Sequence, residues 1–212
     1  MRNYAGLSVL LSLALLAGCT KTVMVDVPPR MDLSRYEALG IIEFTSNADA
    51  AISARATQLF QESIQDAQPG TPFLDLGSRD AVLSAVGSTQ FDADAFRKIG
   101  RKYGVAAVFL GDVAYSSPKT DIKITDIDKL EGGMRTEIRV DMSSKLIETL
   151  SRASVWSSSS WAKRQIGHLE VSAEQGVSGT LRNSDPREEM VPAMIFHLTK
   201  DFRPTSVRQK VN

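Results

Sequence analysis

The regular alternation of residue types over residues 134–146 most constrains the fold of this chain. Its even positions are mainly apolar, and its odd positions are charged residues or serine. Because successive side chains of a strand point to opposite faces, the alternation predicts a long strand with one buried and one wet face, as antiparallel sheets have. Residues 148–152 can turn the chain, and residues 153–163 then predict the partner strand of a long hairpin.

The first half of the chain predicts strands that are buried on both faces. Residues 38–44 and 105–110 are almost continuously apolar, and residues 73–76 predict a further short strand. Segments with apolar residues at helical spacing separate these runs, so we expect crossover helices and some parallel pairing. The predicted order is β-α-β-α-α-β, then the hairpin, then a last helix.

Capping residues mark where these helices begin and end. The candidate N-caps, in chain order, are Ser46 or Asn47, Ser78, Asp92, and Ser184 or Asp185. Gly104 is a predicted helix stop, and residues 168–184, rich in Gly and Ser, predict a loop. The fold class is therefore α/β, of the α+β kind: a single mixed β-sheet of about five strands covered by about four helices, with a long antiparallel hairpin.

Charge and cysteine content exclude several functions. The chain has 25 Lys and Arg against 25 Asp and Glu, so it lacks the basic excess with which proteins bind nucleic acid in general. Its single cysteine excludes an intramolecular disulfide framework and any metal site built from several cysteines. We predict no nucleic-acid partner.

The N-terminal segment predicts export from the cytoplasm. Residues 7–16 form an apolar run, which is shorter than the roughly 20 residues that a membrane-spanning helix needs. A basic residue before this run and small residues after it are typical of a secretory signal. The sequence Leu-Ala-Gly-Cys at 16–19 resembles the lipobox of bacterial lipoproteins. A plain signal peptide with a cysteine near its cleavage site is the alternative.

The lipobox resemblance implies that residues 1–18 are removed and that Cys19 carries lipid. Three acyl chains hold a protein permanently on a membrane, whereas one gives only marginal binding. Thr20 in place of Asp favours the outer membrane under the sorting rule of enteric-type bacteria. The predicted organisation is a signal peptide over 1–18, a lipidated tether over 19–35, a periplasmic domain over 36–202 and a C-terminal tail over 203–212.

Three segments of the domain resemble one lipoprotein group. They are residues 36–44, residues 103–112, and residues 139–147 followed by 153–156. In this order, behind a lipobox, they are similar to curli-secretion (CsgG-like) lipoproteins and to relatives with a TolB amino-terminal-like fold, which include lipoprotein activators of penicillin-binding proteins. The resemblance covers roughly residues 30–202. It implies an α+β periplasmic domain and, as one option, a secretion channel.

The sequence carries no recognisable catalytic or metal-binding motif. The lipid occupies the only cysteine, and His168 and His197 are predicted in a polar loop and on the last helix. The chain has no HExxH motif and no GxxxxGK[ST] phosphate loop. The aspartates of residues 121–128 lack the glycine and glutamate of a calcium loop. We therefore predict no catalytic, cofactor-binding or metal-binding residues and no cofactor.

Four apolar residues are the candidate partner-binding site. Ile122 and Ile124 alternate with charged residues and leave room for an edge strand that pairs with a partner. Trp156 and Trp161 differ by an odd number, so an unbroken strand places them on opposite faces. One can then serve the core while the other anchors a partner, although helices or loops can instead cover both. We expect residues 115–133 and 153–163 to carry the contact.

The sequence thus predicts a non-enzymatic lipoprotein of the bacterial outer membrane, attached through lipid on Cys19, with its domain in the periplasm. It binds or scaffolds another envelope protein, or associates with itself. The alternative is a subunit of a homo-oligomeric CsgG-like secretion channel, which needs membrane strands of about 9–11 residues with alternating apolar and polar positions. An envelope hydrolase is the third hypothesis.

Overall fold

A computed structural model describes residues 21–126, 131–172, 176–181 and 186–211. The chain divides into two compact units. The larger unit consists of residues 30–203, and in the smaller one residues 21–29 associate with residues 204–211. No helix within the described residues is long and apolar enough to cross a membrane.

The larger unit is built on one mixed sheet. Its strands are β2 (Leu39–Ile42), β3 (Thr45–Ser46), β4 (Phe73–Gly77), β5 (Ala107–Tyr115), β6 (Lys119–Asp126), β7 (Glu131–Glu148), β8 (Ser154–Ser172) and β9 (Gly176–Leu181). They lie in the order β4-β2-β5-β7-β8-β9, with β3 beside β5 and β6 beside β7. β2, β3, β4 and β5 pair in parallel, and every other pairing is antiparallel. The α+β class is confirmed, but the sheet has eight strands rather than about five.

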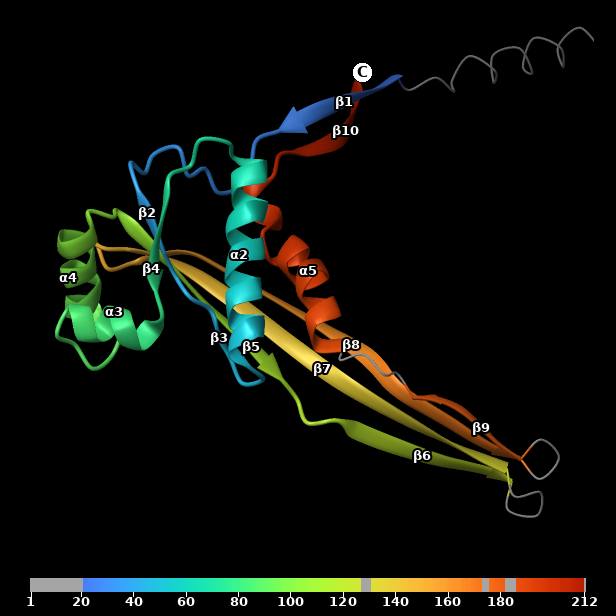
Figure 1. The fold of residues 1–212 in the computed structure, drawn as a ribbon. Helices are drawn as coiled ribbons and strands as arrows, with labels where there is room; N and C mark the ends of the chain where they lie inside the picture. The colour runs from blue at the N-terminus through green and yellow to red at the C-terminus, as the bar shows by residue number, and fades with distance from the viewer. Residues whose placement is uncertain (1–20, 127–130, 173–175, 182–185, 212) are drawn as a thin grey trace, which may run out of the picture. The chain divides into compact units, whose positions relative to one another are not determined.

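Helices cover both faces of this sheet. They are α2 (Ala50–Ala67), α3 (Arg79–Ala85), α4 (Ala93–Tyr103) and α5 (Pro186–Leu198), followed by a 3-10 turn, η1 (Lys200–Phe202). Figure 1 shows α2 and α5 side by side, with α3 and α4 grouped away from them. The predicted order β-α-β-α-α-β is found in β2, α2, β4, α3, α4 and β5, and the structure adds the unpredicted strands β3 after β2 and β6 between β5 and the hairpin.

Most helix ends follow the predicted caps. Ser78 and Asp92 accept backbone N–H groups of the first turns of α3 and α4, and Gly104 ends α4 with a φ of 69°. The predicted cap of the first helix was wrong, because Asp49 caps α2. Asn47 instead bonds the backbone of Tyr115 in both directions, at 2.8 Å each, and so ties the entry of α2 to β5.

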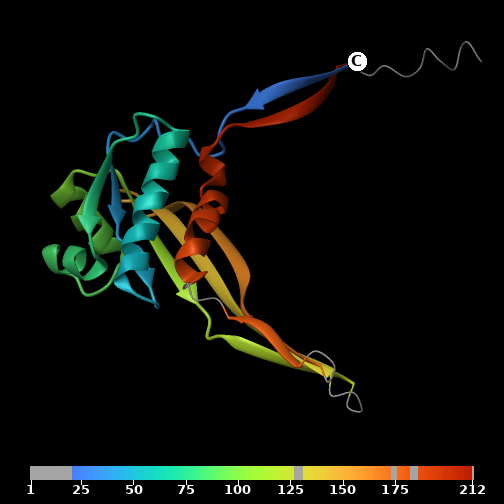
Figure 2. The ribbon, with the colours of Figure 1, turned by 45° about the vertical axis from the view of Figure 1, so that its right-hand side comes forward.

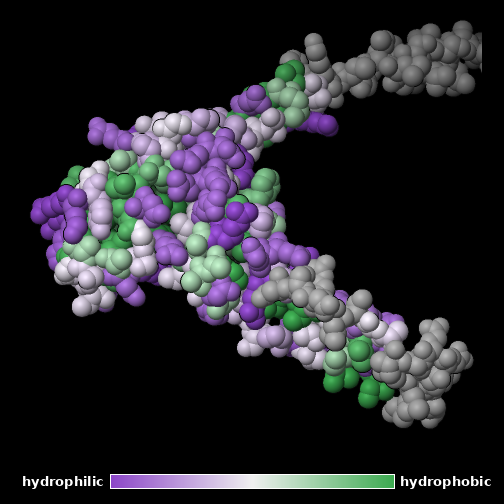
Figure 3. All heavy atoms as spheres, in the orientation of Figure 1, coloured by the Kyte–Doolittle hydropathy of each residue, from purple (hydrophilic) through white to green (hydrophobic). Residues whose placement is uncertain are grey.

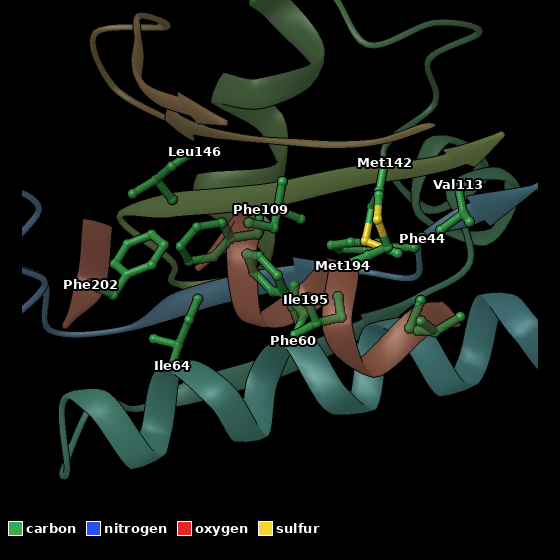
Figure 4. Close-up of a cluster of buried hydrophobic side chains, with 14 of the residues drawn as sticks. Phe44, Phe60, Ile64, Phe109, Val113, Met142, Leu146, Met194, Ile195 and Phe202 are labelled. Carbon is green, nitrogen blue, oxygen red and sulfur yellow. The ribbon is translucent and has the colours of Figure 1, made fainter. Parts of the chain in front are cut away.

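The main hydrophobic core lies between the sheet and the pair α2 and α5, as Figure 4 shows. Aromatic rings form its centre. The Phe60 ring lies 5.0 Å from that of Phe44 and 5.2 Å from that of Phe109, between centroids. A smaller cluster, which includes Val82, Phe96 and other residues, packs α3 and α4 on the opposite face. The sheet is therefore covered on both faces near β2, β4 and β5.

The hairpin is longer than the sequence indicated. The turn after Glu148 is where it was expected, but β7 and β8 extend past the helices and are flanked by β6 and β9. We call this four-stranded extension the arm: residues 119–126, 131–137, 165–172 and 176–181. Figures 1 and 2 both show it projecting beyond α5. The loop predicted over 168–184 was wrong where it is described, because residues 168–172 and 176–181 are paired strands.

The smaller unit is a two-stranded antiparallel ribbon of β1 (Lys21–Val27) and β10 (Thr205–Val211). Its register runs from Lys21 opposite Val211 to Val27 opposite Thr205. These segments were predicted to be parts of a tether and a tail, and their pairing was not predicted. Almost the whole sequence separates the two strands, so no local sequence pattern indicates that they pair.

Candidate partner-binding surface

Trp156 belongs to the core, which corrects its selection as a candidate partner-binding residue. Its side chain is 8 % exposed, and its ring centroid lies 4.6 Å from that of Phe202 and 5.9 Å from that of Phe109. The indole Nε1–H donates to Asp201 Oδ2 at 3.2 Å. A partner cannot reach a ring packed in this way without opening the core.

Trp161 lies on the opposite face of β8 and is 61 % exposed, so the prediction from odd spacing is confirmed. It stands opposite Asp141, and the Arg139 guanidinium lies 4.9 Å from its ring centroid. Arg139 also donates to both carboxylate oxygens of Asp141. These hydrogen bonds hold the pKa of the Asp141 carboxyl below its ordinary value. The surroundings of Trp161 are thus charged and already paired.

Ile122 and Ile124 lie on β6 in the arm and are 73 % and 68 % exposed. Directly opposite residues of an antiparallel pair share a face. The register places Ile122 opposite Met134, and Met134 opposite Leu169. The three residues therefore form one apolar row across β6, β7 and β8. On the same face the Thr120 and Thr136 hydroxyls are 3.0 Å apart.

Glycines leave this row uncovered. Ile124 lies opposite Gly132, and Leu169 lies opposite Gly179 on β9. A Cβ at Gly179 would come within 2.5 Å of the His168 carbonyl oxygen, so a side chain there would force β8 and β9 apart. The missing side chains expose the flanks of the two apolar residues. Figure 3 shows hydrophobic residues gathered on the distal part of the arm.

The apolar face of the arm continues the core-facing side of the sheet. Along β7, Met134 and Thr136 share the side of Ile138 and Val140, which are buried beneath the helices. Arg164, opposite Ile138, pairs with Glu189 of α5 at 2.8 Å, near the end of the helical cover. Farther out the same side of the strands meets no described helix. We call Ile122, Ile124, Met134 and Leu169 the arm patch.

The other face of the arm is polar. Asp121 lies opposite Arg135, and Arg135 opposite His168. On β8 the His168 Nε2 is 2.9 Å from a Glu170 carboxylate oxygen. Lys123 on β6 shares this face, since it alternates with the two isoleucines. Trp161 lies on the polar side of the sheet, so the structure does not bring it together with Ile122 and Ile124.

Sequence reasoning missed Met134 and Leu169 as parts of the surface. Met134 was assigned to the buried face of the hairpin, and Leu169 fell in a predicted loop. The signal that could have found them is the alternation itself, because it runs on past the residues that the last helix can cover. The last helix covers only part of the strand's length.

The hollow between α2 and α5 is not a candidate catalytic or metal-binding site on the described surface. Its volume is about 350 Å³. The Arg203 guanidinium borders it and donates to the Ser63 hydroxyl at 2.6 Å, the Thr199 hydroxyl at 2.8 Å and the Phe196 carbonyl at 2.9 Å. Burial lowers the pKa of Arg203. No group of three or more metal-ligating side chains occurs in the part of the chain that the structure describes.

Comparison with known proteins gives similarities of fold only. No protein-family model matches the chain, and no curated protein matches it. Among solved structures it is similar to the PelC dodecamer from Paraburkholderia phytofirmans, with 11% identity, a TM-score of 0.43, and coverage of 86% of this chain and 98% of that one. A lipoprotein, GNA1162 from Neisseria meningitidis, matches with 13% identity, a TM-score of 0.36 and coverage of 60% and 83%.

The LpoB C-terminal domain from Salmonella enterica matches with 11% identity, a TM-score of 0.36, and coverage of 73% of this chain and 93% of that domain. The neighbours of the fold thus include a bacterial lipoprotein. At these scores, the function is inferred from this chain's own residues.

Proposed function

We propose that this chain is a non-enzymatic, lipid-anchored envelope protein that binds a protein partner through the arm patch. The observation that carries the proposal is the row of apolar side chains that leaves the core beneath the helices and continues uncovered along the arm. Exposed apolar residues rimmed by polar ones mark interaction sites on soluble domains. Thr120 and Thr136 border the row on its own face, while Asp121, Lys123 and Arg135 occupy the opposite face of the arm.

The free energy that burial of the exposed isoleucines would supply favours a specific contact over chance exposure. Burying an isoleucine side chain that was exposed contributes roughly 1.5–3 kcal/mol. Ile122 and Ile124 together can therefore supply several kilocalories per mole before the half-buried Met134 and Leu169 add their exposed parts. Lys119 and Lys123 on the edge strand β6 oppose unspecific pairing with other strands, as edge lysines do.

In-cell photocrosslinking tests the arm patch. A photoreactive residue at Ile122 or Ile124 of the full lipoprotein should capture a partner that mass spectrometry identifies. The same residue at Lys123, between them on the opposite face, is the matched control and should capture much less. Ile122→Ser combined with Ile124→Ser should weaken binding at least about tenfold, the effect of about 1.4 kcal/mol. Capture from position 123 or from Trp161 in place of the isoleucines would reject the patch.

Lipidation of Cys19 supplies the attachment in this proposal. The lipobox sequence at 16–19 supports it, and so does the position of the only cysteine. Cys19→Ser should abolish incorporation of a fatty-acid probe and leave the protein off the outer membrane. Label retained by the Ser variant would show that the lipid is elsewhere.

A second candidate function, a subunit of a homo-oligomeric secretion channel in the outer membrane, is favoured by the edges of the arm. Within the described residues, the outer edges of β6 and β9 pair with no strand. β6 and β9 run in opposite directions, so β9 of one copy can add antiparallel to β6 of the next and continue the sheet from copy to copy. A mass measurement of the lipoprotein in detergent separates the candidates, since a channel requires a large ring. Crosslinks from Ile122 to the chain itself would also favour self-association.

A further inference from the structure

The ribbon of β1 and β10 has one valine face. Val23, Val25 and Val27 occupy alternate positions of β1 and therefore share a side. Val207 on β10 lies directly opposite Val25 and points to the same side. These four side chains are between 36 and 47 % exposed. We call them the valine face.

The other face of the ribbon is polar and basic. Lys210 lies opposite Thr22, Arg208 opposite Met24, and Ser206 opposite Asp26. The Ser206 hydroxyl donates to Asp26 Oδ1 at 2.7 Å, while no ion pair of Arg208 or Lys210 with a described residue is present. The described side chains therefore place the four valines on one face, with Thr205 and Gln209 beside them. Arg208 and Lys210 lie on the other face with Met24, which is comparable to the two faces of an amphipathic helix at a membrane surface.

A ribbon of this kind needs a surface to lie on. Two paired strands alone are only marginally stable in water, because they lack a third strand or a helix to bury one face. Covering the valine face would remove this weakness. The sequence position indicates what covers it: β1 begins at Lys21, two residues after Cys19, and two residues span at most about 7 Å.

We propose that the valine face lies on the lipid bilayer that holds the anchor, with Arg208 and Lys210 attracting anionic headgroups. This inference rests on the proposed lipidation of Cys19. An acyl anchor holds the ribbon at the bilayer surface, so the valines meet lipid at a high effective concentration. Basic residues near an anionic bilayer are attracted to it. The long side chains of Arg208 and Lys210 can reach the lipid headgroups from the face of the ribbon opposite the valines.

The backbone limits how deeply the ribbon can enter. The outer edge of each strand carries N–H and C=O groups that the other strand cannot reach. Such groups need water or headgroups as partners, and the hydrocarbon interior offers neither. The ribbon therefore lies in the interfacial region, parallel to the surface, with only the valine side chains directed toward the acyl chains.

Site-specific fluorescence on the full lipoprotein tests this placement. Because lipid consumes the thiol of the only cysteine, a substituted cysteine is a unique labelling site. Val207→Cys places an environment-sensitive dye on the valine face, and Arg208→Cys places it one residue away on the opposite face.

In vesicles of phosphatidylethanolamine and phosphatidylglycerol, we expect a blue-shifted emission at position 207. Spin-labelled lipids should quench it several-fold more than at position 208. Arg208→Gln with Lys210→Gln should reduce quenching at position 207 in these vesicles and leave it unchanged in vesicles of neutral lipid alone.

The outcomes separate the inference from the function on which it rests. Protein that does not float with the vesicles contradicts the lipid anchor, and the ribbon placement with it. If the protein floats with the vesicles but the dyes at positions 207 and 208 are both unquenched, the lipid anchor is retained and the placement of the valine face on the bilayer is overturned. A blue shift that grows with protein density and is insensitive to spin-labelled lipid would assign the valine face to a second copy of the chain instead.

Discussion

The two tryptophans give a sharp test of which face of the hairpin is buried. Trp156 and Trp161 stand on the same strand with opposite environments, so the same substitution should have opposite consequences at the two positions. Trp156→Ala removes a ring in contact with Phe109 and Phe202 and leaves a cavity between β5 and η1. Substitutions of this kind destabilise proteins by about 3–5 kcal/mol.

The structure favours the upper part of that range for Trp156. The substitution also removes the indole N–H from which Asp201 Oδ2 accepts a hydrogen bond. The Asp201 side chain is 16 % exposed and would keep Arg30, at 3.5 Å, as its ion-pair partner. A domain of this size shifts its Tm by about 2–4 °C per kcal/mol, so a loss of about 4–5 kcal/mol should lower the melting temperature by roughly 8–20 °C. Trp161→Ala loses only an exposed contact with Arg139 and should cost less than about 1 kcal/mol.

Thermal and urea unfolding followed by far-ultraviolet circular dichroism measure both changes. Each variant also retains a single tryptophan, so its emission reports one environment. Trp161→Ala should leave the blue emission of buried Trp156, and Trp156→Ala should leave the red emission of exposed Trp161. Equal destabilisation by the two substitutions, or red emission from the Trp161→Ala variant, would refute the assignment of faces.

Two further substitutions test packing and capping. Gly111→Ala should destabilise the protein by about 1–3 kcal/mol in urea unfolding, because the new Cβ would come within 2.3 Å of the buried Phe44 ring. Gly133→Ala is the control: its Cβ meets nothing closer than 3.5 Å, so it should change the stability by less than about 1 kcal/mol. A hydrogen bond from the Ala95 backbone N–H holds the pKa of Asp92 below its ordinary value. The ionised carboxylate therefore stabilises the fold at pH values above the unfolded-state pKa of Asp92. This contribution is lost as the pH falls through the folded-state pKa. Asp92→Asn keeps a capping oxygen but cannot titrate, so the Tm should fall less between pH 5 and pH 3 than it does in the parent protein. An equal fall of Tm in the two proteins would contradict this role of Asp92.

The buried strands and the helix ends of the larger unit could be predicted because their signals are local. The apolar run that contains β5 indicates a strand between two covered faces, and Asp92 and Gly104 mark the two ends of α4 within a few residues. The opposite faces of Trp156 and Trp161 followed from parity alone. Each of these inferences needed only neighbouring residues.

Pairings between distant segments could not be predicted in the same way. β9 contains two glycines and a serine and has little strand propensity, yet it pairs with β8 because a regular backbone edge is already in place. Asn47, a good helix cap by type, bonds the distant backbone of Tyr115, and Asp49 takes its role. The arm patch is a product of such pairing, since Ile122, Met134 and Leu169 meet only through the register.

The register of the ribbon also decides where an attached label would be. Val211 lies opposite Lys21, so the end of the chain returns to within a few residues of Cys19. A fluorescent protein fused after Asn212 would therefore stand at the end of the ribbon where the proposed lipid on Cys19 would attach, whereas a short affinity tag there would serve as a substitute for that anchor. Protein without lipid, captured on a sensor chip through such a tag, would be held by the same end of the ribbon that the proposed lipid on Cys19 would hold.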